Sequence, residues 1–243
     1  MSYKIPFALL CAVLPSFSED YVKPQPEVTK TEHIDFAPGG TIRLDGSYGD
    51  FFVEGWDEPE MEMTVTKSMR YRYDSAASPQ AAKRMASVEV VTDRPSPTEL
   101  VITSKVPPRS GVNVILPPTP SDKKAGVLLE YYLHVPRNSR LVIHHGTGQI
   151  LIRDVTGEID ASCSMGEMSL WLPGGGAYAI DARSRVGTVL SEFGGSKRSH
   201  YLFGQTFMSE ASTGAQRIHL RVGYGNITIE PILPESEEPH AGR

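Results

Sequence analysis

Residues 146–190 read GTGQILIRDVTGEIDASCSMGEMSLWLPGGGAYAIDARSRVGTVL, and a glycine followed by apolar residues two and four positions later recurs in this stretch. After Gly148 these positions hold Ile150 and Ile152, whereas after Gly187 the second of them is a serine. We take five glycines as the starts of such units: Gly49, Gly148, Gly166, Gly187 and Gly225. Glycine adopts positive φ at tight corners, and apolar alternation is typical of a half-buried strand. Each unit therefore predicts a corner followed by a short strand.

The spacing of these glycines predicts how the units are arranged. From Gly148 onward the steps are 18, 21 and 38 residues, the last being about two ordinary steps. A fixed period of roughly 20 residues, with one strand and one corner per unit, is typical of stacked coils. We therefore predict an all-β fold, a single-chain β-solenoid (β-helix-like) of short stacked coils. The unit at Gly49 would open this stack and the unit at Gly225 would close it.

The rest of the chain predicts the domain organisation. Residues 1–18 have the features of a secretory signal peptide: a positive start, an apolar core and small residues before a cleavage site after Ser18. The further segments we expect are a flexible tether (19–32), an N-terminal β segment capping the solenoid (33–106), the solenoid repeats (107–231) and a disordered acidic tail (232–243). One short helix is expected near residues 78–86, because Ser78-Pro79 is a favoured helix start. The glycine-rich stretch 194–198 predicts a mobile loop.

Composition limits the classes of partner and compartment. The formal net charge of −5 argues against a nucleic-acid partner held by phosphate contacts. No apolar run is long enough to span a bilayer, so we expect no transmembrane span in the mature chain. If the signal is removed, Cys163 is the remaining thiol, which excludes a disulfide within the chain. Its place in the alternation predicts a buried core side chain rather than a nucleophile.

Candidate chemistry is sparse, and we expect no catalytic residue, no metal site and no cofactor. His144 and His145 are adjacent in a predicted strand and must face opposite ways, so they cannot share a metal ion. His134 and His144 flank a predicted turn but lack a third ligand. The acidic residues that suggest calcium do not have the spacing of a known loop: Asp45, Asp50, Glu54, Asp57 and Glu58. A polysaccharide-active enzyme would need paired carboxylates on one face, for which Asp160 and Glu167 are the candidates.

Several motifs occur in an order that resembles a known family. They are the opening Ser47-Tyr48-Gly49-Asp50-Phe51 unit, the stretch from Val53 to Asp57, the strand end Val135-Pro136 and the closing Gly225-Asn226-Ile227-Thr228-Ile229. This order is similar to that of the bacterial putative-adhesin domain of unknown function, an exported β-solenoid with a likeness to auto-transporter adhesin heads. The likeness covers residues 34–231. It implies a fold and an exported, periplasmic or cell-surface location, and no catalytic residues.

Together these observations predict a non-catalytic adhesin or cell-envelope interaction and scaffold protein. Trp171 is the candidate partner-binding residue, because it lies between inward-facing Leu170 and Leu172 and should face out. A covering loop formed by residues 194–212 is the alternative. The expected partner is an envelope component or a glycan, and self-association through the solenoid ends would protect open strand edges. An envelope-stress sensor and a polysaccharide-active enzyme on a β-helix remain alternative functions.

Overall fold

The computed structural model describes residues 27–69, 83, 85–105, 127–200, 203–209 and 214–232. Within these residues the chain is all-β, as the sequence predicts, and its strands form two mixed sheets. The predicted signal peptide, most of the proline-rich stretch before residue 127 and most of the acidic tail lie outside the described residues. Among the described residues, no helix has the length and apolar character needed to cross a membrane.

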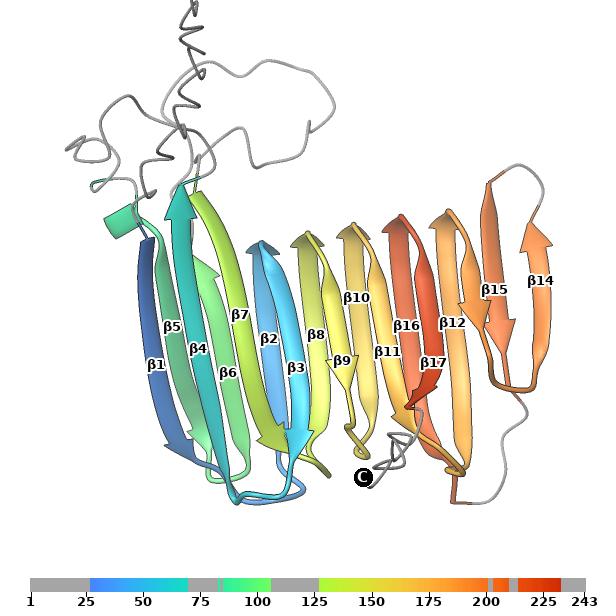
Figure 1. Cartoon of the computed structure of the whole chain (residues 1–243), viewed down its shortest axis with the longest axis horizontal. Helices are drawn as coiled ribbons and strands as arrows, with labels where there is room; N and C mark the ends of the chain where they lie inside the picture. Colours follow the sequence, from blue (N-terminus) through green and yellow to red (C-terminus); the bar gives the residue numbers. More distant parts are fainter. Residues whose placement is uncertain are drawn as a thin grey trace, which may run out of the picture.

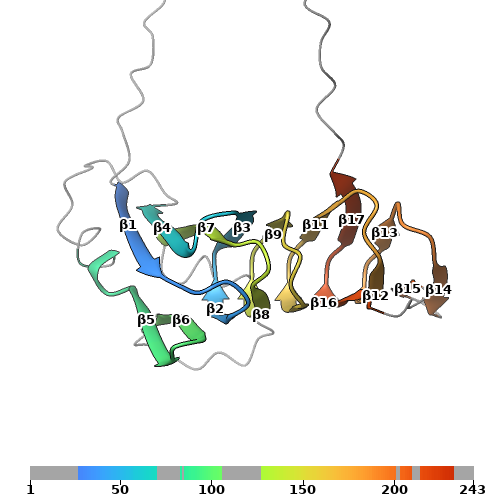
Figure 2. The same cartoon turned by 90° about the horizontal axis from the view of Figure 1, so that it is seen from below.

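The two sheets lie face to face, and the chain passes repeatedly from one to the other (Figures 1 and 2). Sheet A has the strand order β1 (Glu27–Asp35), β4 (Glu60–Met69), β7 (Val127–Pro136), β3 (Asp50–Trp56), β9 (Ile150–Arg153), β11 (Met168–Pro173), β17 (Ile227–Ile232), β13 (Val189–Ser191). Sheet B has the order β14 (Ser196–His200), β15 (Gly204–Met208), β12 (Tyr178–Val186), β16 (Gln216–Tyr224), β10 (Ile159–Met165), β8 (Arg140–Thr147), β2 (Thr41–Tyr48), β6 (Glu99–Lys105), β5 (Glu89–Ser96).

Each predicted glycine unit forms part of one rung, which we define as a sheet B strand, a glycine corner and the sheet A strand that follows. Neighbouring rungs pair in parallel and in register, so that Met168 lies between Ile150 and Ile227. The side chains that point between the sheets make one apolar core. Of the inward positions that the alternation predicts within the repeats, Val186 is only half-buried and the others are buried, including Cys163.

The five corner glycines stack directly on one another. Their φ angles lie between +120° at Gly49 and +148° at Gly166, a range that L side chains rarely adopt. A Cβ placed on Gly166 would lie 1.8 Å from the carbonyl oxygen of Gly148, and one on Gly225 would lie 1.7 Å from that of Gly166. The backbones can therefore approach closely only because no side chain is present at these corners.

The order of the rungs differs from the order of the sequence, which corrects the prediction that the Gly225 unit closes the stack. Strand β17 lies between β11 and β13, and β16 lies between β10 and β12. The chain leaves a one-strand gap in each sheet when it passes from β11 to β12, and its last two strands fill that gap. The 38-residue step between Gly187 and Gly225 therefore contains the β14–β15 hairpin and a return, and not two successive coils.

Three local expectations also need correction or restriction. Strand β1 begins at Glu27, so the last part of the predicted tether is an edge strand that pairs along β4. Residues 196–198 of the expected mobile loop 194–198 belong to edge strand β14 (Ser196–His200), which pairs with β15. Both strands are rich in polar side chains, which hides the alternation that marks a half-buried strand. Of the predicted helix, the described residues show one helical turn that ends near Ser87.

The glycine column gives a first prediction. Gly166→Ala should lower the free energy of unfolding by about 2–4 kcal/mol, because it combines an unfavourable φ with a backbone clash. Gly175→Ala is the control for φ alone, since Gly175 has φ +79° and no atom within 4 Å of an added Cβ. Gly194→Ala, with neither feature, should be nearly neutral. Urea unfolding of the three variants checks this order, and equal losses at Gly166 and Gly175 would contradict the packing argument.

A second prediction concerns alkaline pH. Burial raises the pKa of Tyr48 to about 12, from a usual value of 10.0, so its phenol loses a proton more readily in the unfolded chain. The contribution of this difference in pKa to the free energy of unfolding is fully present below pH 10 and is lost as the pH rises from 10 through 12. The Tyr48 hydroxyl is buried without a hydrogen-bond partner, so Tyr48→Phe should fold at neutral pH and lose less stability between pH 10 and 12. Urea midpoints across this range test it, with the exposed Tyr224→Phe as control.

Candidate functional site

The outward face of sheet A carries side chains in continuous rows, because its strands pair in register. One row, here called the charged row, consists of His33, Glu62, His134, Glu54, Arg153, Trp171 and Glu230. Glu62 contacts His33 at 3.5 Å and His134 at 3.0 Å, and Glu54 contacts Arg153 at 3.7 Å. Most members of this row therefore already have a partner of opposite charge or a hydrogen-bond partner within it.

The neighbouring row is apolar and partly exposed. We call Tyr132, Phe52 and Leu151 the aromatic row, since Phe52 pairs with Tyr132 on β7 and with Leu151 on β9. The rings of Phe52 and Tyr132 are stacked, with centroids 4.7 Å apart and an interplanar angle of 10°. Tyr132 is 43% exposed. Its pKa is raised by burial, and the nearby carboxylates of Glu130 and Asp50 raise it further.

Polar groups border the aromatic row on its other side. Asp50 and Glu130 are paired on β3 and β7, and Asp50 Oδ1 accepts a hydrogen bond of 2.8 Å from the backbone N–H of Gln149. The aromatic row thus lies between two lines of charged and hydrogen-bonding groups on a sheet face. An aromatic platform with polar groups at its margins can stack on a flat, partly apolar ligand and hydrogen-bond its hydroxyls.

The structure places Trp171 in the charged row, on interior strand β11 between Arg153 and Glu230. Its ring is half-buried, and its Nε1 donates a hydrogen bond of 3.1 Å to Glu230 Oε2. The alternative of a cover formed by residues 194–212 does not match the strand order, because β14 and β15 belong to sheet B. Phe52 and Tyr132 were missed by the sequence reasoning. The signal was the doublets Phe51-Phe52 and Tyr131-Tyr132, in which one ring must face the core and the other the surface.

The histidines considered for metal binding point to different faces or lie on different sheets. His144 is exposed and contacts Asp45 at 3.0 Å, whereas His145 is buried, with its ring nitrogens near the carbonyl oxygens of Gly46 and Gly49. The two adjacent histidines therefore face opposite ways, as predicted. His134 and His144 are on different sheets. No group of three or more metal-ligating side chains occurs in the described part of the chain.

The acidic residues are held in separate contacts. Arg137 donates to Asp57 at 3.0 Å and also contacts Asp154, and its hydrogen bond and charge lower the pKa of the Asp57 carboxyl. Asp160 lies in β10 and contacts His219 at 3.1 Å, while Glu167 lies at the corner between β10 and β11. Of the two candidate carboxylates, Asp160 thus contacts a histidine on a sheet B strand, and Glu167 lies at the corner that follows.

Comparison with known proteins gives structural likenesses of low similarity. No protein-family model matches the chain, and no curated protein matches it. A putative cell adhesion protein from Clostridium sporogenes is 13% identical over 86% of this chain and all of its own, with a TM-score of 0.48. Putative adhesins from Bacteroides fragilis and Parabacteroides distasonis are 12% and 10% identical, each over 84% of this chain and 97% of their own, with TM-scores of 0.29 and 0.22.

The third prediction separates the binding face from the core. Tyr132→Ala should lower the free energy of unfolding by about 1 kcal/mol or less, because it removes a partly exposed cross-strand pair. Tyr131→Ala, one residue away in β7, should cost about 3–5 kcal/mol, because that ring is 1% exposed and packs on Phe51 at 4.6 Å. Urea unfolding of the two variants tests this contrast. Similar losses would mean that the aromatic row is required for folding.

Proposed function

We propose that this chain is an exported, non-catalytic binding module of the adhesin type. In this proposal the aromatic row and Trp171 on sheet A contact a carbohydrate of a cell surface or envelope. The observation that carries it is the partly exposed, stacked Phe52–Tyr132 pair on a broad sheet face, bordered by polar rows. Fully solvated β faces are usually polar, so an aromatic strip at this position has a clearer explanation in binding than in folding.

The architecture supports a scaffold that presents this face. Parallel rungs stacked through a glycine column give a solenoid-like body with a regular spacing of side chains, which suits a repetitive partner. We propose that polar edge strands, rather than self-association, protect its two ends. Strand β1 exposes Lys30 at one end and β14 exposes Lys197 and Arg198 at the other. Charged edges oppose pairing between sheets of two molecules.

A co-sedimentation experiment tests this proposed function. The full chain is mixed with insoluble carbohydrates (peptidoglycan sacculi, chitin and cellulose), and the bound fraction is measured for the wild type, Trp171→Ala and Tyr132→Ala. Each variant should bind about tenfold more weakly to the preferred carbohydrate, since each loses a stacking surface. Leu190→Ala is the matched control, because Leu190 is exposed on β13 of the same sheet and away from the aromatic row. Binding that is absent, or equal in all four proteins, would refute the proposal.

A further inference from the structure

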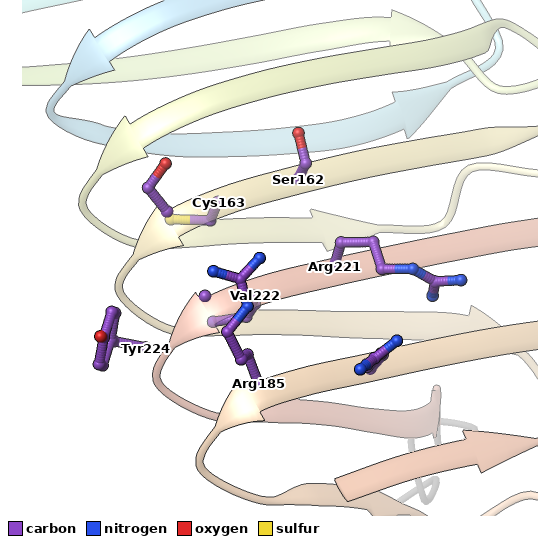
Figure 3. A pocket seen from close by; sticks show the side chains of 9 residues that line it. Ser162, Cys163, Arg185, Arg221, Val222 and Tyr224 are labelled. Carbon is purple, nitrogen blue, oxygen red and sulfur yellow. The ribbon is translucent and has the colours of Figure 1, made fainter. Parts of the chain in front are cut away.

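The outer face of sheet B contains an open groove that is lined by arginines. The groove has a volume of about 420 Å³ and lies over β10, β16 and β12 (Figure 3). Its charged lining consists of Arg183, Arg185 and Arg221, and no carboxylate lines it. The hydroxyl-bearing side chains Ser162 and Ser164 form one wall. We call this feature the arginine groove.

Strand register brings the arginines together. Arg221 on β16 pairs directly with Arg183 on β12, and Arg183 in turn pairs with Thr206 of β15, which is opposite Arg198 on β14. Like charges directly opposite each other across neighbouring strands destabilise a sheet. The pairing of Arg183 with Arg221 is therefore unfavourable for folding except where a negative group compensates it, as Asp181 does for Arg221. An anion bound at Arg183 would remove the remaining repulsion.

The arginines differ in how firmly they are held. Arg221 Nη2 donates to Asp181 Oδ2 at 2.5 Å, and its Nη1 donates to the carbonyl oxygens of Asp181 and Leu220 at 2.9 Å each. That network fixes the guanidinium in place. Arg183 and Arg185 are exposed and have no carboxylate partner among the described residues. One arginine is thus pre-positioned, while two offer all of their N–H groups to a ligand.

Two other basic side chains on the same face have carboxylate partners. One row away, His219 contacts Asp160 at 3.1 Å and Asp181 at 3.7 Å. Nearer the opposite ends of the strands, Arg217 donates to Glu158 at 2.8 Å. The uncompensated positive charge of this part of the sheet B face therefore lies at Arg183 and Arg185 and continues to the exposed Arg198 on β14. In Figure 3, Arg185 and Arg221 come from adjacent strands, the Arg221 side chain extends away from Arg185, and Tyr224 lies at the glycine corner.

We propose that the arginine groove binds tetrahedral oxyanions, sulfate or phosphate esters, carried by a polysaccharide. A guanidinium presents parallel N–H groups that match two oxygens of such an anion. Small neighbours keep the groove floor open, because Gly223 and Ser164 lie beside Arg185 in the lining. Tyr224 is 55% exposed at the rim and offers an aromatic face to a sugar ring.

The site extends beyond a single anion. From Ser162 on β10 to Arg198 on β14 the row crosses five strands, about 19 Å at the usual strand spacing. A polymer lying across the strands would meet Arg221, Arg183 and Arg198 in turn, at separations of one strand and then two strands. The formal charge of −5 on the whole chain confines this attraction to the groove and disfavours nucleic acid as the polymer.

A matched set of polymers tests the proposal. The full chain is titrated with dextran sulfate, dextran phosphate, carboxymethyl-dextran of the same charge density and unmodified dextran, and with duplex DNA. Sulfate or phosphate dextran should bind at least tenfold more tightly than the other three, and which of the two is preferred identifies the ester. Equal binding of carboxymethyl-dextran would mean attraction by charge alone, and equal or tighter binding of DNA would indicate a different class of ligand. Either result overturns the proposal.

Variants locate the binding and separate it from folding. Arg183→Ala and Arg185→Ala should each weaken binding about tenfold and make it less sensitive to salt. Arg183→Lys should give an intermediate loss of affinity, because lysine keeps the positive charge but lacks the paired N–H groups of a guanidinium. Arg217→Ala, which removes an ion-paired arginine from the same face, should bind as the wild type does. Urea midpoints of Arg183→Ala should be equal to or above those of the wild type, since a like-charge pair is removed.

The sheet A variants distinguish this site from the proposed adhesin face. Trp171→Ala and Tyr132→Ala should leave the affinity for dextran sulfate or phosphate unchanged, because they lie on the opposite face of the molecule. Loss of polyanion binding in the arginine variants together with unchanged carbohydrate co-sedimentation would show two independent sites. Unchanged polyanion binding in both Arg183→Ala and Arg185→Ala would overturn the arginine groove while leaving the sheet A proposal intact.

Discussion

The close approach of backbones at the glycine corners is the constraint on which the whole arrangement depends. At each of five corners the chain turns from sheet B into sheet A with a φ that a side chain would resist. At four of them a Cβ would overlap the carbonyl oxygen of the neighbouring corner glycine, and at Gly49 it would meet that of Leu129. The absence of side chains here permits the distance between rungs that the strand hydrogen bonds require. The close stacking of the corners also keeps both sheets in register, because a corner that moved would displace the strands on either side of it. The core and both outer faces follow from that register.

The sequence allows much of the local structure to be predicted, because the relevant signals lie within a few residues. The corner glycines and the alternation after them identify rungs, and the buried positions follow directly, as for Ile150 and Met168. The order of the rungs could not be predicted, since it depends on which edge a distant strand joins. A step of 38 residues fits two coils as well as it fits an excursion and a return. Edge strands β1 and β14 were missed because polar side chains on both faces leave no alternation.

The difference between local sequence signals and strand order also decides what could be predicted of the candidate sites. Trp171 could be placed on an outer face from its neighbours alone, but its hydrogen bond to Glu230 requires the return of β17 beside β11. The pairing of Arg183 with Arg221 has the same origin, because β16 reaches β12 only by entering the gap. The sequence around one residue predicts whether its side chain faces the core or the surface. The topology decides which residues become neighbours across strands, and both proposed binding surfaces depend on such neighbours.

The position of the last rung has a consequence for how the molecule is assembled. In both sheets, strands β10 and β11 are joined to β12 and β13 through β16 and β17, so the stack stays divided in two until β16 and β17 have been added. These two strands follow the others in the sequence, so a ribosome releases them after both halves. Until then, the strand edges of the two halves that face each other have unpaired backbone N–H and C=O groups. Strands β16 and β17 then pair with both halves and complete the two sheets.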